Sequence, residues 1–416
     1  MRLLFLSNFY PPLAIGGYEL WCEEVATELE KRGHQVHILT SRYGLQDGTA
    51  QIDPLPVQRT LHLMTDLDYY APAHFFRYWH KEEAHNRREL VSAINTIQPD
   101  VMLVWGMWNL SLSLPYWAEN LLPGRVAYYL SSYWPIDVDA HHSYWNAPAN
   151  SRLGRALKRP LRHWANRRLR AAGYPPALRF CHSVCCSHYV RNTLIAAKAV
   201  PAETSVLQGG TDPAPFLAAA AERQPAADRR LRLLYFGRLV FDKGVHTILE
   251  ALAILKDQVD LSRLRLTILG SGHPDYEASL HSFVQQHELA DCVDFISQVH
   301  RSDVPEYLGQ HDVYLFSSIW AEPMARSVME AMAAKLLVIG SEVGGQMEML
   351  QNGVNSLTFS AGDAEGLARQ IALSLADPEL RVRLAAAGQA LVLSDFTLDR
   401  MVDRIEAWLG AVANAA

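Results

Sequence analysis

Two stretches of the chain share one pattern and decide the fold that we expect: Met1-Arg2-Leu3-Leu4-Phe5-Leu6-Ser7 and Leu231-Arg232-Leu233-Leu234-Tyr235-Phe236-Gly237. Each is an almost continuous apolar run, which is typical of a strand buried on both faces of a parallel sheet. Each is followed by a glycine-containing loop and a segment with helical periodicity, the order found where strands and helices alternate. Because this opening occurs twice, we predict an α/β protein with two Rossmann-like domains.

The size and composition of the chain agree with this expectation. Its 416 residues are many for one hydrophobic core and natural for two domains. An apolar content of 49%, a charged content of 20% and a net charge of −6 describe a globular protein that is not a general nucleic-acid binder. The five cysteines are odd in number and form no Cys-x-x-Cys pair, which argues against a disulfide framework or a zinc site. These cysteines fit a reducing cytoplasm, where we expect the protein. No apolar run reaches the ~18 residues of a membrane span.

Apolar runs and stop signals predict the positions of the main elements. The helix after Gly17 should end at the basic, glycine-terminated turn Lys31-Arg32-Gly33. The last helix should cover about 397–414, and the proline-containing segment 213–230 should lie between the domains. The expected strands lie near residues 3–7, 35–40, 101–105, 125–130 and 182–186 in the first half, and near 232–237, 265–269, 293–296, 312–316 and 336–340 in the second.

Charged residues gather where strands of the second half end. Gly237-Arg238 closes the first of these strands, and Lys243-Gly244 opens the following helix. Arginine can bind two phosphate oxygens at once and lysine supplies a point charge, so both side chains suit a phosphate ligand at the carboxyl edge of a parallel sheet. Farther along, Trp320-Ala321-Glu322-Pro323-Met324-Ala325-Arg326-Ser327-Val328-Met329-Glu330 places one carboxylate before a predicted helix and another within it. A carboxylate can accept hydrogen bonds from two hydroxyl groups.

These motifs, together with Gly16-Gly17 after the first strand, resemble the donor site of the retaining glycosyltransferases of family 4, which have the GT-B fold. The resemblance covers nearly the whole chain and is patchy between about residues 60 and 180. It implies two Rossmann-like domains that face each other across a cleft. The acceptor-side domain would comprise 1–212, the donor domain 213–394, and the last helix, within 395–416, would cross back to the first domain.

The resemblance also implies roles for individual residues. In the family, the counterparts of Arg238 and Lys243 hold the donor diphosphate without a metal, so neither a metal nor a cofactor is expected. Glu322 would contact the hydroxyls of the transferred sugar, which makes Glu322, Arg238 and Lys243 the expected catalytic residues. The remaining donor contacts would come from Gly16, Gly17, Gly237, the base-binding Val299, the backbone of Met324 and Ala325, and Glu330 at the ribose hydroxyls.

Two segments depart from the family pattern. The family usually has His-Asp where this chain has Ser131-Ser132. Serine can bind a sugar hydroxyl but cannot act as a base near neutral pH, so we assign Ser131 to substrate binding and assign no catalytic histidine. In the acidic motif, the usual Gly and Phe-Gly are replaced by Pro323 and Met324-Ala325. Asp137-Val138-Asp139 followed by His141-His142 suggests a metal site, but the cations available for phosphate make one unnecessary.

One segment of the first half is strongly basic. Residues 151–173 contain eight lysines and arginines in a basic amphipathic pattern interrupted by Pro160, and no acid: Arg152, Arg155, Lys158, Arg159, Arg162, Arg167, Arg168 and Arg170. One interpretation is that this segment docks to an anionic membrane face or to a phosphate-bearing lipid-linked acceptor. The other is that it is a solvated helix face, or a helix whose charges are neutralised by acids elsewhere in the fold. The aromatic run from Tyr69 to Trp79 either lines an acceptor groove or is a packed insertion.

We therefore predict a retaining, metal-independent glycosyltransferase that moves a hexose from a nucleotide sugar to a hydroxyl of a glycan or lipid-linked acceptor. The expected donor is a UDP-hexose, and a GDP-sugar stays open. One alternative is a catalytically silent sugar-nucleotide-binding protein, which the Ser131-Ser132 replacement keeps open. The other is a nicotinamide-dependent oxidoreductase, although Gly270-Ser271-Gly272 is not part of a complete dinucleotide-binding glycine motif.

Overall fold

The structure divides into two compact units. The computed structural model describes residues 1–13, 16–44, 54–67, 69–149, 151–223 and 230–415. The N-terminal unit consists of Met1–Cys186, Val190–Leu207 and Val402–Ala416, and the C-terminal unit consists of Ser187–Tyr189 and Gln208–Met401. The chain therefore changes unit between Leu207 and Gln208 and again after Met401, whereas the sequence placed these boundaries after 212 and 394.

Within the described part of the N-terminal unit, seven parallel strands form one sheet in the order β3-β2-β1-β4-β5-β6-β7. The adjacent strands β1 and β4 lie in the middle of this sheet and are buried along almost their whole length, as their continuous apolar runs predict. The strands are β1 (Arg2–Ser7), β2 (Gln35–Ser41), β3 (Val57–Leu61), β4 (Val101–Gly106), β5 (Val126–Leu130), β6 (His182–Cys185) and β7 (Ser205–Val206).

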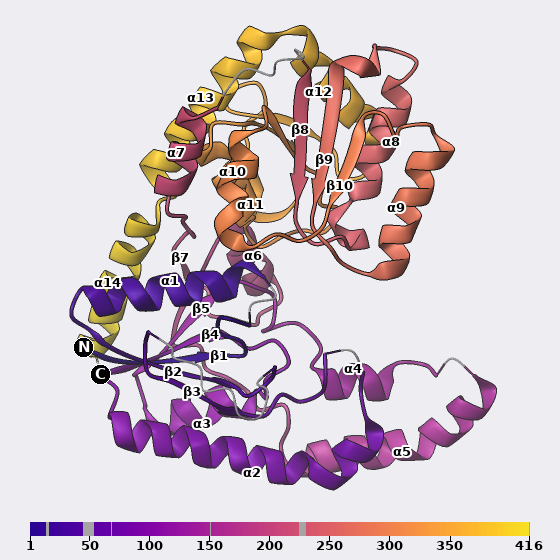
Figure 1. Ribbon diagram of the computed structural model, residues 1–416. Helices are drawn as coiled ribbons and strands as arrows, with labels where there is room; N and C mark the ends of the chain where they lie inside the picture. The colour runs from indigo at the N-terminus through magenta and orange to yellow at the C-terminus, as the bar shows by residue number, and fades with distance from the viewer. Residues whose placement is uncertain (14–15, 45–53, 68, 150, 224–229, 416) are drawn as a thin grey trace. The chain divides into compact units, whose positions relative to one another are not determined.

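Helices cover both faces of this sheet. In Figure 1, α1 lies on one face, and α2 and α3 lie on the other. Helix α1 ends at Lys31 as predicted, and Gly33 adopts the left-handed conformation (φ +90°) that stops a helix. The helices of this unit are α1 (Gly17–Lys31), α2 (Pro72–Ile97), α3 (Ser113–Leu121), α4 (Ala140–Asn146), α5 (Arg152–Ala171), α6 (His188–Ala196, from Val190 onward) and most of α14 (Leu398–Ala415).

The C-terminal unit repeats the same architecture around six described strands in the order β10-β9-β8-β11-β12-β13. Helices again cover both faces, with α8 and α9 on one side of β8 and α10 and α11 on the other (Figure 1). The elements are β8 (Leu231–Phe236), α8 (Val245–Leu255), β9 (Leu264–Leu269), α9 (Pro274–Gln286), β10 (Val293–Ile296), α10 (Val304–Gly309), β11 (Val313–Phe316), α11 (Arg326–Ala333), β12 (Leu337–Ser341), β13 (Leu357–Phe359), α12 (Ala364–Ala376) and α13 (Pro378–Asp395), preceded by α7 (Ala214–Ala221).

The last helix returns to the N-terminal unit, which confirms the predicted crossing. From Val402 onward α14 belongs to that unit. Arg32, just after α1, binds Asp403 and Glu406 of α14 at 2.7 Å each, and His34 Nε2 lies 2.7 Å from Glu406. The apolar side of α14 is buried, so hydrophobic burial and these partly exposed ion pairs both hold the helix in place.

The expectation that 213–230 lies between the domains is wrong for the part that the structure describes. Residues Ala214–Ala221 form α7 within the C-terminal unit, where α7 packs on α10 and α11. Pro213 and Pro215 stand at the start of this helix, where prolines are tolerated, and the alanine-rich run favours a helix. Arg223 then ties the segment down by donating to the carbonyl oxygens of Leu308 and Ala334 at 3.2 and 2.6 Å. Residues 224–229 lie outside the described part of the chain.

Candidate donor site

The candidate donor site lies where the strand order of the C-terminal sheet reverses. Strands β8 and β11 are neighbours, and the chain proceeds outward from them in opposite directions. Loops at the carboxyl ends of two such strands diverge and leave room for a ligand. The loop after β8 carries Gly237, Arg238 and Lys243, and the loop after β11 carries Glu322, Met324 and Ala325. Most of the residues predicted to bind the donor therefore come from this pair of loops.

Lys243 and Glu322 form an ion pair at this edge. The distance from Lys243 Nζ to Glu322 Oε2 is 2.8 Å, and Glu322 is 9% exposed. Its other oxygen, Oε1, is buried and has no hydrogen-bond partner among the described residues. The two loops are closely packed: at Gly244 (φ +66°), a Cβ atom would lie 2.0 Å from the carbonyl oxygen of Ser317. Glu322 is thus a buried carboxylate with one oxygen bound to a cation and one still able to accept.

Arg238 is the second cation of this edge. Its side chain is exposed and makes no hydrogen bond or ion pair with any residue that the structure describes. Its carbonyl oxygen accepts from the Tyr235 hydroxyl at 2.9 Å. Burial raises the pKa of Tyr235 well above its usual value, the charge of Glu322 raises it further, and Arg238 opposes the rise, so the hydroxyl stays protonated. The Arg238 guanidinium therefore has all its donors available for an anionic ligand.

A second pair of glycines holds the Glu322 loop. The Gly345 amide donates to the Glu322 carbonyl oxygen at 2.8 Å. A Cβ at Gly344 (φ +65°) would lie 2.2 Å from that same oxygen, and a Cβ at Gly345 would lie 1.8 Å from the Pro323 carbonyl oxygen. Side chains are excluded at both positions, so Gly344-Gly345 supports the acidic loop even though the loop itself carries Pro323 where the family usually has glycine.

Glu330 lies within α11, as predicted, but its surroundings were not foreseen. It is 1% exposed and sits between two guanidinium groups. Arg326 Nε donates to Oε1 at 2.7 Å, and Arg301 binds both carboxylate oxygens, Oε2 at 2.9 Å. Burial alone would raise the pKa of Glu330, but Arg301 and Arg326 outweigh it and hold that pKa below its usual value.

The remaining predicted residues of this unit have simpler environments. Val299 is half-buried in the loop after β10, at the same edge of the sheet. Met324 and Ala325 are buried, and Ala325 directly precedes α11. Gly270 and Gly272 serve packing: a Cβ at either would come within 2.0 Å of a carbonyl oxygen of the β8 loop. Close packing therefore explains why glycine stands at both positions, and no bound dinucleotide is needed to explain this Gly-x-Gly.

Two family models together match most of the chain. The family model described as Glycosyltransferase Family 4 matches residues 15–214, and the one described as Glycosyl transferases group 1 matches 219–391. The chain therefore consists of a Glycosyltransferase Family 4 domain followed by a Glycosyl transferases group 1 domain. An amylovoran biosynthesis glycosyltransferase of Erwinia amylovora is 32% identical over 209 residues, which are 49% of this chain and 49% of that protein. The matched stretch thus spans about half the length of that relative.

Two longer likenesses each cover at least 95% of the chain. A glycogen synthase of Mycobacterium tuberculosis is 24% identical over 95% of this chain and 91% of its own length. A solved structure of an Anabaena protein in complex with UDP superposes with a TM-score of 0.70 at 19% identity, covering 99% of this chain and all of the other. The structural likeness establishes the GT-B fold.

Three predicted site residues, Gly16, Gly17 and Ser131, lie in the N-terminal unit. Gly16 directly precedes α1 and Gly17 begins it, and the Gly16 amide donates to the carboxylate of the fully buried Glu19 at 2.9 Å. Ser131 is buried directly after β5. Each thus stands at the carboxyl end of a strand or at the start of a helix, as the sequence indicated.

The Asp-x-Asp string has a structural role. Asp139 precedes α4 and accepts hydrogen bonds from the amides of His141 and His142 at 3.0 and 3.2 Å. Its other oxygen lies 2.6 Å from His142 Nδ1. Helix capping therefore explains this aspartate. Across the described ranges, no cluster of three or more histidine, cysteine or acidic side chains is arranged to hold a metal ion. The independence of the reaction from metal stays a prediction.

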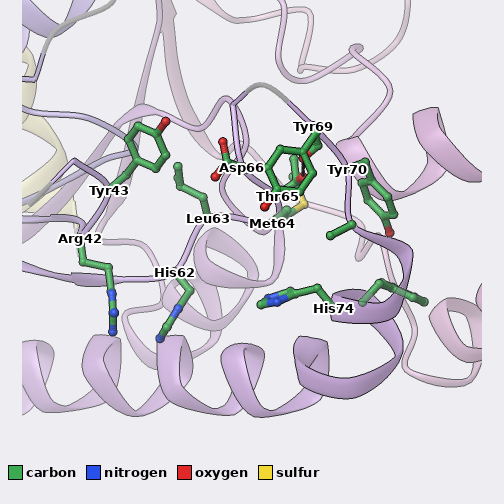
Figure 2. Close-up of a pocket in the computed structure, with 12 residues that line it drawn as sticks. Arg42, Tyr43, His62, Leu63, Met64, Thr65, Asp66, Tyr69, Tyr70 and His74 are labelled. Atoms are coloured by element: carbon green, nitrogen blue, oxygen red, sulfur yellow. Dashed lines mark hydrogen bonds between the residues drawn. The ribbon is translucent and has the colours of Figure 1, made fainter.

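The aromatic run of the N-terminal unit is divided between core and surface. Phe75 and Trp79 are buried in a cluster with Trp145 and Leu169, as a packed insertion would be. Tyr69 is 64% exposed and lines a pocket of about 260 Å³. Figure 2 shows this pocket, with Arg42 and His62 pointing toward the helix below them. Packing accounts for Phe75 and Trp79, and an acceptor groove lined by Tyr69 stays a prediction.

Proposed function

We propose that this protein is a retaining glycosyltransferase that transfers a hexose from a UDP-sugar to a hydroxyl of a glycan or lipid-linked acceptor, without a metal. The observation that carries the proposal is the Lys243–Glu322 ion pair at the strand-order reversal, in which the buried Glu322 has its Oε1 without a partner among the described residues. A sugar hydroxyl would supply the hydrogen bond that this oxygen lacks.

The two cations suit the departing diphosphate. Breaking the bond between the anomeric carbon and the diphosphate oxygen leaves negative charge on the phosphate, and fixed positive charges stabilise that charge. Arg238 and Lys243 supply them from one loop. The acceptor oxygen would attack from the face that the diphosphate leaves, which retains the anomeric configuration, and the departing phosphate would take the acceptor proton. Glu322 would stabilise the positive charge that develops on the sugar ring.

The Anabaena protein of the same fold has also been solved with UDP-glucose, which supports a UDP-hexose as the first donor to test. The direct experiment incubates the purified chain with radiolabelled UDP- and GDP-hexoses, with and without EDTA, and measures release of free sugar. The proposal predicts hydrolysis of at least one UDP-hexose that EDTA does not abolish. Binding without turnover of any donor would favour the silent sugar-nucleotide-binding protein, and thermal stabilisation by NAD but not UDP would favour the oxidoreductase.

Replacing Arg238 by alanine should lower kcat/KM for the donor about 100-fold, because one of the two cations at the diphosphate is lost. Since the side chain is exposed and has no described partner, the fold should be unaffected. Arg263, an exposed arginine that precedes β9 at the opposite edge of the sheet, provides the matched control Arg263→Ala. Equal kinetics for Arg238→Ala and this control would remove Arg238 from the site.

We also propose that helix α5 docks the protein on an anionic membrane surface. Three large apolar side chains are exposed on it: Leu157 (62%), Leu161 (45%) and Trp164 (72%). They recur at helical spacing, whereas Ala165 and Leu169 face the core. An apolar stripe flanked by cations is the pattern of a helix that lies in the plane of a membrane interface.

The cations of α5 are not neutralised by the described part of the protein. Five described arginines of the helix are exposed and form no ion pair with any described acid: Arg155, Arg159, Arg162, Arg167 and Arg170. This disfavours the internally neutralised helix that the sequence left open. Among the described residues, no helix is both long and apolar enough to cross a bilayer. Surface docking is therefore the membrane contact that we propose.

The full chain should float with vesicles that contain phosphatidylglycerol and not with pure phosphatidylcholine vesicles, and high salt should release it. A variant with Leu157, Leu161 and Trp164 replaced by serine should lose at least nine-tenths of the bound fraction while hydrolysing the donor normally. Replacing Val382 and Leu373, exposed apolar residues of the C-terminal unit, gives a matched control. Flotation that depends on neither lipid charge nor the α5 residues would refute membrane docking.

A further inference from the structure

The N-terminal unit contains a cavity to which no role has been given. Its volume is about 430 Å³, within the range of small-molecule pockets. The lining residues follow three strands of the sheet: Met64–Leu67 after β3, Met107–Leu110 after β4, and Trp134 with Asp137–Ala140 after β5. The cavity thus lies at the carboxyl edge of the sheet, where ligands of open α/β sheets bind.

Asn109 in the wall of this cavity is buried but only partly satisfied. It is 7% exposed, and its Nδ2 donates to the Thr65 carbonyl oxygen at 2.8 Å. The Met64 amide donates to the Asn109 carbonyl oxygen at 2.9 Å. Its side-chain oxygen Oδ1 has no hydrogen-bond partner in the described part of the chain. The residue is therefore held firmly while one acceptor stays open.

Trp134 supplies a second unsatisfied group, this time a donor. Its ring is 5% exposed and packs near Phe180 and Tyr128, with ring centres 5.6 and 6.3 Å away. Its Nε1 is buried and lacks a partner among the residues that the structure describes. A buried donor and a buried acceptor without partners cost stability, and both costs fall if one ligand provides hydroxyl groups.

The charges and the exposed ring narrow the class of ligand. Among the described residues, three aspartates and no lysine, arginine or histidine line the cavity, so an anionic ligand is disfavoured. Trp108 at the same wall is 47% exposed, which leaves its indole ring available for packing. The neighbouring pocket of Figure 2 shares Met64–Asp66 but contains Arg42, His62 and His74, so the two differ in charge.

We propose that this cavity binds an uncharged saccharide. The apolar face of a sugar ring would pack on Trp108, one hydroxyl would donate to Asn109 Oδ1, and another would accept from Trp134 Nε1. Asp137, which is exposed at the rim, would accept from further hydroxyls. That the saccharide is the acceptor of the transfer reaction rests on the proposed function, whereas the binding itself does not.

The test uses the full chain saturated with UDP and a panel of methyl hexosides, methyl N-acetylglucosaminide, maltose and lactose, followed by saturation-transfer NMR and calorimetry. At least one of these sugars should bind saturably. Its Kd should rise at least ten-fold in Trp108→Ala and in Trp134→Phe, the latter of which keeps a ring and removes only the N–H donor. Tyr116→Ala, at an exposed aromatic residue of α3 outside the cavity, should leave the Kd unchanged. Hexose 6-phosphates should bind at least ten-fold more weakly.

Saturable binding by none of these sugars, or equal binding by the wild type and both cavity variants, would overturn the saccharide site. Tighter binding of the phosphorylated sugars would overturn its uncharged character. These failures are separate from those of the donor site, because hydrolysis of a UDP-hexose is measured without any acceptor. Hydrolysis without saccharide binding refutes the cavity alone, and saccharide binding without hydrolysis refutes the transferase alone.

Discussion

Glu322→Gln should lower kcat for sugar transfer, or for donor hydrolysis where no acceptor is known, about 1,000-fold. Glutamine keeps the size of the side chain and one acceptor oxygen but removes the negative charge beside the sugar ring. If the charge acts mainly in the transition state, kcat should fall far more than the KM for the donor changes. The measurement is a steady-state rate series with labelled UDP-hexose.

The Glu322→Gln variant also breaks the 2.8 Å ion pair with Lys243, so its fold must be checked independently. Retention of thermal stabilisation by UDP would show that the diphosphate is still bound. Glu379→Gln, at an exposed acid in the first turn of α13, is the matched control and should behave as the wild type. A variant that retains more than a tenth of the wild-type kcat would show that Glu322 is not catalytic.

The secondary structure of this protein was largely readable from its apolar runs. Every strand expected from the sequence has a counterpart, because central strands such as β1 and β8 are buried on both faces and admit few polar residues. Strands β3, β7 and β13 were missed. The last two have only two and three residues, and β3 is half-buried, so none shows a clear pattern. Two of the prolines that suggested an interdomain segment at 213–230, Pro213 and Pro215, instead stand at the start of a helix.

The candidate site was predictable only where its residues belong to known motifs. The resemblance to the family assigned Lys243 and Glu322 to one donor site, and in the structure the two side chains form an ion pair. The contact between Arg301 and Glu330 could not be foreseen, since it joins residues 29 apart on different elements. Arg326 is four residues from Glu330 on one helix, a spacing that could have identified it. The cavity of Asn109 and Trp134 depends on three loops that meet only in the folded sheet.

The Arg301–Glu330–Arg326 cluster has consequences for stability as well as for the nucleotide. Both oxygens of Glu330 already accept from guanidinium groups. Ribose hydroxyls would therefore have to share these oxygens, and the ribose role of Glu330 stays a prediction. Glu330 and Arg326 are both buried, with side chains 1% and 9% exposed, so removing the charge of Glu330 from this pair should cost stability.

Glu330→Gln should reduce the free energy of unfolding at pH 7 by about 3–5 kcal/mol, the usual cost of removing one partner from a buried ion pair. Glutamine is isosteric but neutral, so both guanidinium groups lose the negative charge of Glu330. The measurement is equilibrium unfolding in urea. The transition to compare is the one that moves to a higher urea concentration when UDP is added. Glu365→Gln, at a side chain 78% exposed on α12, is the control and should change stability little.

The pH dependence of this loss follows from the direction of the Glu330 shift. Its pKa is depressed in the folded protein, so its stabilising effect is complete above the unfolded value of about 4.3 and is lost as the pH falls through the folded pKa. The difference in stability between the wild type and Glu330→Gln should therefore be constant from pH 7 to about 5 and narrow below about pH 4. A difference that is negligible at pH 7, or that widens in acid, would show that the two arginines do not depend on this carboxylate.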